Sequence, residues 1–238
     1  VLRRARGQGM TTSLDFSFPD PSGDAARADW PAILLDALPA VDLCAPSVEE
    51  LSAMLDPAGY RQRIAAASSS GDVFGPDYAW KLAGTVLELG AAVCLVKLGA
   101  GGMVVRYSRD SARLKDTGLL NLGNRLPAVG TGRYVPAFVA DSVVSATGAG
   151  DSAIAGVLAA LLHGESLLDA VDVGCIAGRN AVATVDAVSA AETLPTMIAQ
   201  REVARKRREQ QVSDGQVSLS GGWQPAQEPG LFAVDQDV

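Results

Sequence analysis

Apolar residues follow two different spacings along the chain, and each spacing predicts a different kind of element. Short runs rich in β-branched and apolar residues have the length of strands; they lie at 11–16, 41–46, 91–99 and 103–108. Between and after them, apolar residues recur at helical spacing over 30–38, 47–55, 76–90, 149–163 and 166–188. Strands that alternate with helices predict an α/β fold, a three-layer α/β/α sandwich with a mostly parallel sheet.

Capping residues support two of these helices. Asp29 precedes a helix that has Pro31 in its first turn, and Ser47 stands three residues before Glu50, which matches a capping box. Residues 110–136 are polar and contain glycine, which predicts a loop or an irregular β segment.

Composition narrows the class of protein. A chain of 238 residues that is 48% hydrophobic and 20% charged is long enough for one domain with a well-buried core. Its formal net charge of −7 argues against a nucleic-acid partner, because phosphate binding needs clustered lysine and arginine. No apolar run approaches the ~18 residues of a membrane helix, so we expect no membrane partner.

The cysteines predict a reducing compartment. Cys44, Cys94 and Cys175 are far apart, form no Cys-x-x-Cys pair, and have apolar neighbours. We therefore expect buried, reduced thiols and a cytoplasmic protein.

The segment at 143–164 changes from β-branched residues to an alanine-rich helix through the small-residue turn Thr147-Gly148-Ala149-Gly150. A glycine turn that opens a helix presents unpaired backbone N–H groups, and the helix dipole adds partial positive charge at the same place. Such a turn binds anions, above all phosphate.

Asp151 directly follows this turn, where a carboxylate would repel a bound phosphate. Its side chain suits proton abstraction from an attacking hydroxyl during phosphoryl transfer. Electrostatic capping of the helix explains an acid at this position equally well. The chain has no G-x-x-x-x-G-K-[ST] loop and no G-x-G-x-x-G after a first strand, which argues against a P-loop enzyme or a dinucleotide dehydrogenase.

The stretch "ATGAGDSAIAGVLAALLHG" resembles the C-terminal signature of the ribokinase-like, PfkB-type carbohydrate kinases. Three further stretches, "SLDFS", "VDLCAPSVEEL" and "CLVKLGAGGMVV", resemble elements of the same family in the same order. The resemblance extends from about residue 5 to about residue 197.

The resemblance implies a role for each matching position. Asp151 would be the general base, and the backbone of Gly148, Ala149 and Gly150 would form the anion hole. The residues implied for the ATP site are Lys97, Gly99, Gly102 and Thr147. Glu50 would act on Mg²⁺ through water, and Asp15 would contact the substrate. From the residues alone, Glu50 is equally well a capping partner, and Asp15 is equally well an ordinary acid at a strand end.

Several positions depart from the family pattern. Ser47 replaces an asparagine, and Lys97 replaces a threonine, although a lysine there can still reach a phosphate. Ser145-Ala146 stands where an aspartate-threonine pair often precedes the motif, which makes a monovalent-cation site doubtful.

The N-terminal part of the family, with its lid, has no counterpart in this chain. We expect residues 1–200 to form the nucleotide-binding, catalytic-base part of the fold, and 201–238 to form a basic helix end and a disordered tail.

The resemblance predicts an ATP-dependent sugar kinase. It also implies that the surface for a possible homodimer belongs to the missing lid. Two alternatives stay open. One is a non-catalytic relative that binds a nucleotide or a sugar phosphate, and the other is a nucleoside kinase of the same fold.

Overall fold

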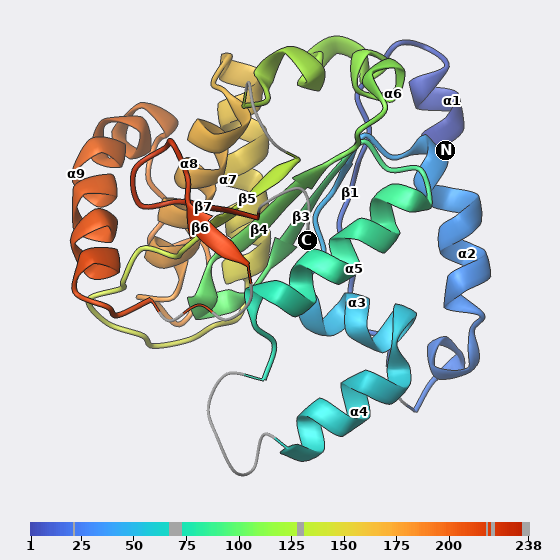
Figure 1. Ribbon diagram of the computed structural model, residues 1–238, viewed down its shortest axis with the longest axis horizontal. Helices are drawn as coiled ribbons and strands as arrows, with labels where there is room; N and C mark the ends of the chain where they lie inside the picture. The colour runs from blue at the N-terminus through green and yellow to red at the C-terminus, as the bar shows by residue number, and fades with distance from the viewer. Residues whose placement is uncertain (21, 67–72, 128–130, 218, 220–221, 235–238) are drawn as a thin grey trace. The chain divides into compact units, whose positions relative to one another are not determined.

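The computed structural model describes the whole chain except residues 21, 67–72, 128–130, 218, 220–221 and 235–238 (Figure 1). The chain divides into two compact units. The first unit contains residues 1–98 and 104–123, and the second contains residues 99–103 and 124–238. Each unit is described by itself below.

The described residues of the first unit form short helices and four strands. The helices are α1 (Leu2–Arg6), α2 (Trp30–Ala37), α3 (Val48–Leu55), α4 (Pro57–Ala66), α5 (Pro76–Glu88) and α6 (Ser111–Lys115). The strands are β1 (Ser13–Leu14), β2 (Leu43–Cys44), β3 (Val93–Lys97) and β4 (Met103–Tyr107), adjacent in that order. The predicted α/β class is therefore confirmed.

Strands β1, β2 and β3 run parallel. Leu14 pairs with Cys44, and Cys44 pairs with Cys94, so the three strands end at one common edge. Strand β4 returns beside β3, and Ser108 N–H donates to Ala92 O at 2.9 Å, as expected for the predicted hairpin. Parallel strands place the residues that follow them at one edge of the sheet, which is where ligands bind in α/β folds.

The predicted helix starts are confirmed. Asp29 accepts a hydrogen bond from Ala32 N–H, and Ser47 and Glu50 form a reciprocal capping box at the start of α3. Helix α5 buries Ala79, Leu82 and Val86 and packs against β3. Its apolar face therefore points to the core, as its spacing predicts.

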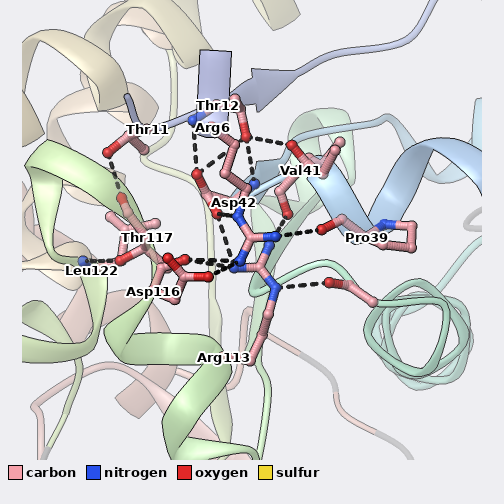
Figure 2. A network of polar contacts seen from close by, with 12 residues as sticks. Arg6, Thr11, Thr12, Pro39, Val41, Asp42, Arg113, Asp116, Thr117 and Leu122 are labelled. Atoms are coloured by element: carbon pink, nitrogen blue, oxygen red, sulfur yellow. Dashed lines mark hydrogen bonds and ion pairs between the residues drawn. The ribbon is translucent and has the colours of Figure 1, made fainter. Parts of the chain in front are cut away.

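A polar network holds the amino ends of β1 and β2 (Figure 2). Asp42 is fully buried and lies 2.8 Å from Arg113 Nη1 and 3.4 Å from Arg6 Nε. Its Oδ2 also accepts a hydrogen bond from Thr12 N–H at 2.9 Å. Arg113 donates further to Val41 O, so α1, α6 and both strand ends are joined at one carboxylate.

The second unit contains β5 (Gly132–Val135), α7 (Ala149–His163), α8 (Leu167–Ala181), α9 (Leu194–Ser213), β6 (Trp223–Pro225) and β7 (Phe232–Val234). Strand β7 lies between β5 and β6 and is antiparallel to both. In Figure 1 the three long helices α7, α8 and α9 lie beside these strands, with α8 packed against both α7 and α9.

The prediction of a disordered tail is wrong for the described residues of β6 and β7. Trp223 and Phe232 are each 7% exposed and lie with ring centroids 5.7 and 6.0 Å from that of Tyr134 on β5. Aromatic side chains bury large apolar areas, which explains why this polar-looking segment pairs with the sheet. Residues 218, 220–221 and 235–238 of the tail lie outside the described part of the chain.

Two other expectations concern residues 110–136 and the cysteines. The first half of 110–136 contains helix α6, which sequence spacing did not reveal, and its end contains β5.

Cys44, Cys94 and Cys175 are buried and free, as predicted. Burial raises the pKa of Cys175 to about 12, so this thiol stays protonated at neutral pH. Within the described residues, no helix is both long and apolar enough to cross a bilayer.

Candidate functional site

The first candidate region is the turn that opens α7. Gly148 is the N-cap residue and has a left-handed backbone, with φ of 77°. No side chain caps this helix within the described residues, and its first helical backbone bond runs from Ser152 N–H to Gly148 O at 2.9 Å. The start of α7 therefore keeps open donors where helix dipole and N–H groups favour an anion.

The amides of this turn are not all available. Ala149 N–H donates to Ala146 O at 3.2 Å, so this predicted anion-hole donor is engaged within the turn. The amides of Gly150 and Asp151 have no backbone or capping acceptor in the part of the chain that the structure describes. Among the described residues, the set of open donors therefore lacks the predicted Ala149, keeps Gly148 and Gly150, and adds Asp151.

Asp151 lies in the first turn of α7, and its side chain is exposed. Among the described residues its carboxylate has no hydrogen bond and no ion pair. Thr147 is also exposed, and its N–H donates to Ser145 Oγ at 3.2 Å. Both side chains are accessible to a ligand that binds at the turn.

The turn is held by the segment that follows α8. Val182 O accepts hydrogen bonds from Val144 N–H at 2.7 Å and from Ser145 N–H at 3.3 Å. A Cβ added to Gly148 would lie 2.4 Å from Ala187 Cβ, so only glycine fits there. Hydrogen bonds from Ser189 and the Val188 amide hold the pKa of Asp186 below its ordinary value, and they shape the turn that carries Ala187.

Gly148→Ala is expected to destabilise the protein more than Gly164→Ala does. Both glycines have positive φ, 77° and 106°, so each alanine incurs about 1–2 kcal/mol of backbone strain. Only the alanine at 148 collides with a neighbour, which adds about 1–3 kcal/mol. Urea denaturation of the two variants measures the difference. Equal losses of unfolding free energy would contradict the close contact with Ala187.

The glycines after β3 have two different roles. Gly99 has φ of 57°, and a Cβ there would meet nothing within 4 Å, so its surroundings leave room for a ligand. Gly102 has φ of 99°, but a Cβ there would lie 2.1 Å from Val135 O. Gly102 is therefore required by the close approach of its own backbone to β5, which is a reason independent of any nucleotide.

The second candidate region is the carboxyl edge of β1, β2 and β3 in the first unit. Lys97, at the end of β3, donates to both carboxylate oxygens of Asp15, at 2.6 and 2.8 Å. The two side chains are 11% and 26% exposed. Asp15 also accepts a hydrogen bond from Phe16 N–H. The sequence predicted both residues as ligand contacts but not that they would bind each other.

Ser47 and Glu50 lie at the same edge. Ser47 forms an isolated parallel bridge with Lys97, and Lys97 N–H donates to Pro46 O at 2.9 Å. Glu50 Oε2 accepts from Ser47 N–H at 2.7 Å, which commits one carboxylate oxygen to the capping box. The structure thus brings Asp15, Ser47, Glu50 and Lys97 to one strand edge.

The described residues contain no group of three or more His, Cys, Asp or Glu side chains arranged to hold a metal ion. Mg²⁺ in nucleotide sites is commonly held by phosphates and water with one or two carboxylates, so a full protein cage is not required. The second oxygen of Glu50 has no partner among the described residues, and it fits such a water-mediated contact.

Exposed valines beside the α7 turn were not predicted as part of a site. They are Val139, Val143, Val144, Val185 and Val188, which are 56–78% exposed. The hydrogen bond from Val144 N–H to Val182 O joins the two segments that carry these valines. Ala187, which lies between Val185 and Val188 in the sequence, packs against Gly148. Their apolar character was visible in the sequence, but their exposure was not, because valine normally predicts burial.

A protein-family model for pfkB family carbohydrate kinases matches residues 2–194. No curated protein sequence matched the chain. Among solved structures, an Arabidopsis thaliana ribokinase with ribose and ATP aligns with a TM-score of 0.56 and 16% identity, over 85% of this chain and 51% of that one.

Other kinases align similarly. A Salmonella enterica aminoimidazole riboside kinase has a TM-score of 0.56, with 18% identity over 83% of this chain and 54% of that one. A Vibrio cholerae fructokinase has a TM-score of 0.56, with 16% identity over 83% of this chain and 53% of that one. The chain thus spans about half the length of these structures. At these identities the likeness concerns the fold, and the family match covers most of the chain. The resemblance noted in the sequence is confirmed, and this chain belongs to the pfkB family of carbohydrate kinases.

Proposed function

We propose that this chain is the nucleotide-binding and catalytic-base part of an ATP-dependent kinase that phosphorylates a hydroxyl of a sugar. The observation that carries the proposal is the start of α7, where an uncapped helix, a left-handed glycine and an accessible carboxylate occur together. Membership of the pfkB family supports this assignment.

In the proposed mechanism, Asp151 accepts the proton of the acceptor hydroxyl as that oxygen attacks the γ-phosphorus, while the bond from this phosphorus to the β,γ-bridging oxygen breaks and ADP leaves. The amides of Gly150 and Asp151 donate to the oxygens of the transferred phosphoryl group, where negative charge is concentrated. Gly148 gives the turn its left-handed backbone, and its missing side chain makes room for Ala187, which packs against the turn. When bound, Mg²⁺ would neutralise phosphate charge.

Residues beside the turn, together with Gly99 after β3, also suit the rest of a nucleotide. Val144 and Val185 belong to the exposed apolar surface beside the turn, which suits the face of a purine ring. Gly99 leaves open space at the end of β3, and Thr147 has an accessible hydroxyl. We propose that these groups contact ATP. Within the first unit, the free oxygen of Glu50 suits a contact to Mg²⁺ through water.

A nucleotide titration followed by a product screen tests the proposal. With Mg²⁺ present, we expect isothermal titration calorimetry to detect ATP binding to the chain. The protein is then incubated with ATP and a panel of hexoses, pentoses and nucleosides, and ADP is measured. ADP formation that depends on a sugar supports the proposal, and turnover with nucleosides alone would reassign the acceptor. Absence of ATP binding would overturn the proposal.

A non-catalytic nucleotide-binding relative is the second candidate. Two observations favour it: Ala149 N–H is engaged by Ala146 O, and the charge of Lys97 is neutralised by Asp15. Both reduce the number of free groups that stabilise a transferred phosphoryl. This candidate predicts ATP binding with thermal stabilisation but no ADP release with any acceptor.

A further inference from the structure

Helix α9 carries arginines that face carboxylates of α8 and of the residues just before it. Arg201 Nη1 lies 2.6 Å from Glu165 Oε2, and Arg205 Nε lies 2.6 Å from Asp172 Oδ2. Arg208 Nη1 lies 2.7 Å from Asp172 Oδ1, and both of these side chains are 1% exposed. A row of ion pairs therefore joins α9 to α8, and it ends in a fully buried pair.

By itself, a buried ion pair adds little to the free energy of unfolding. Removing two charges from water costs several kcal/mol per ion, which their attraction offsets only with good geometry. Arg208 Nε is buried and has no hydrogen-bond partner among the described residues, so part of its desolvation is uncompensated. A buried pair of this kind can instead specify one register of the two helices.

Arg208 also contacts the segment that leads to the α7 turn. Its guanidinium carbon lies 4.7 Å from the centroid of the Phe138 ring, and its Nη1 lies 3.4 Å from Pro136 O. Phe138 is 6% exposed, so the cation–π contact is shielded from water. Arg208 thus links α8, through Asp172, to residues 136–138.

The backbone of helix α8 packs closely against the backbone of the first two turns of α7. A Cβ on Gly174 would lie 2.7 Å from Ala153 O, and one on Gly178 would lie 3.3 Å from Ala149 O. The residue that follows α8, Val182, binds the amides of Val144 and Ser145 just before the turn. A shift of α8 would therefore displace the turn, because close-packed backbones leave no free space.

We infer that Asp172 and Arg208 form a positioning pair that sets the orientation of the amides at 148–151. Helix α9 begins at the last residue of the family match, so most of this helix lies beyond residues 2–194. Helix α9 holds α8 and the 136–138 segment in one arrangement. Helix α8 contacts the turn that opens α7, and residues 136–138 precede that turn in the chain. The expected effect of this pair on ATP binding rests on the proposed function.

ATP binding to Arg208→Met and Arg207→Met tests the inference. Arg207 is the exposed neighbour on α9, which makes it a matched control. Arg205 still pairs with Asp172 in the Arg208→Met variant. We expect this variant to bind ATP about tenfold more weakly, while the control stays within about twofold of the unchanged chain. Equal affinities in both variants would overturn the inference.

Amide hydrogen exchange supplies a readout that needs no nucleotide. We expect Arg208→Met to accelerate exchange in peptides that cover residues 144–151, while peptides that cover β2 and β3 in the first unit keep their rates. Unchanged exchange at 144–151 would overturn the inference. If the unchanged chain binds no ATP, the proposed function fails, and the exchange result alone decides the inference.

The double variant Asp172→Leu/Arg208→Met separates positioning from stability. Replacing a buried ion pair by apolar side chains of similar volume is often neutral or stabilising. Arg205 loses Asp172 in this variant but keeps its ion pair with Asp169. We therefore expect the double variant to keep its melting temperature and still to show weakened ATP binding or faster exchange at 144–151. If both readouts return to those of the unchanged chain, the pair contributes only stability, and the inference is wrong.

Discussion

Asp151→Asn is expected to lower the rate of phosphoryl transfer by about 10²–10⁴-fold, the usual contribution of a general base. Asparagine has nearly the same shape as aspartate but cannot accept the hydroxyl proton at neutral pH. ATP binding is expected to persist or to tighten, because the substitution removes a negative charge beside the phosphates. ADP release with the best acceptor measures turnover, and calorimetry measures ATP affinity.

Asp141→Asn is the matched control for this variant. Asp141 is an exposed carboxylate on the segment that leads to the same turn, and the proposed mechanism gives it no role. Turnover by this control is expected to equal that of the unchanged chain. If Asp151→Asn also keeps its turnover and loses only thermal stability, Asp151 is an electrostatic cap of α7 and not the base.

Asp42→Asn is expected to lower the free energy of unfolding by about 3–5 kcal/mol, the usual cost of removing one partner from a buried ion pair. Asp42 is fully buried between Arg6 and Arg113 (Figure 2). The substitution removes the carboxylate that pairs with Arg113, while Arg6 keeps its ion pair with the exposed Asp116. Urea denaturation followed by circular dichroism measures the loss.

Asp36→Asn is the control for the buried carboxylate. Asp36 pairs with Arg3, but the two side chains are 74% and 65% exposed, so solvent screens the pair. We expect this variant to lose at most about 1 kcal/mol. Similar losses in the two variants would show that Asp42 does not hold the amino ends of β1 and β2 together in the way its contacts indicate.

The local elements were predictable because their signals are short-range. The capping box at Ser47 and Glu50, the start of α2 at Asp29 and the apolar face of α5 each depend on residues within about one or two helical turns. The glycine turn before Asp151 was recognised for the same reason. Helix α6 was missed because its five residues are too few to produce a helical period.

Only the tertiary structure decided how groups from distant parts of the chain meet. The binding of Lys97 to Asp15, and of Arg208 to Asp172, joins residues on different elements, and no spacing along the chain encodes such a distance. In the same way, the aromatic contacts of Trp223 and Phe232 explain why a segment predicted to be a disordered tail contains strands. The sequence by itself determined the α/β class, the helix starts and the glycine turn that opens α7, because local backbone geometry and periodic burial depend on neighbouring residues. Which carboxylates are free and which are paired depended on packing, because a charge buried during folding must find its partner wherever the chain brings one.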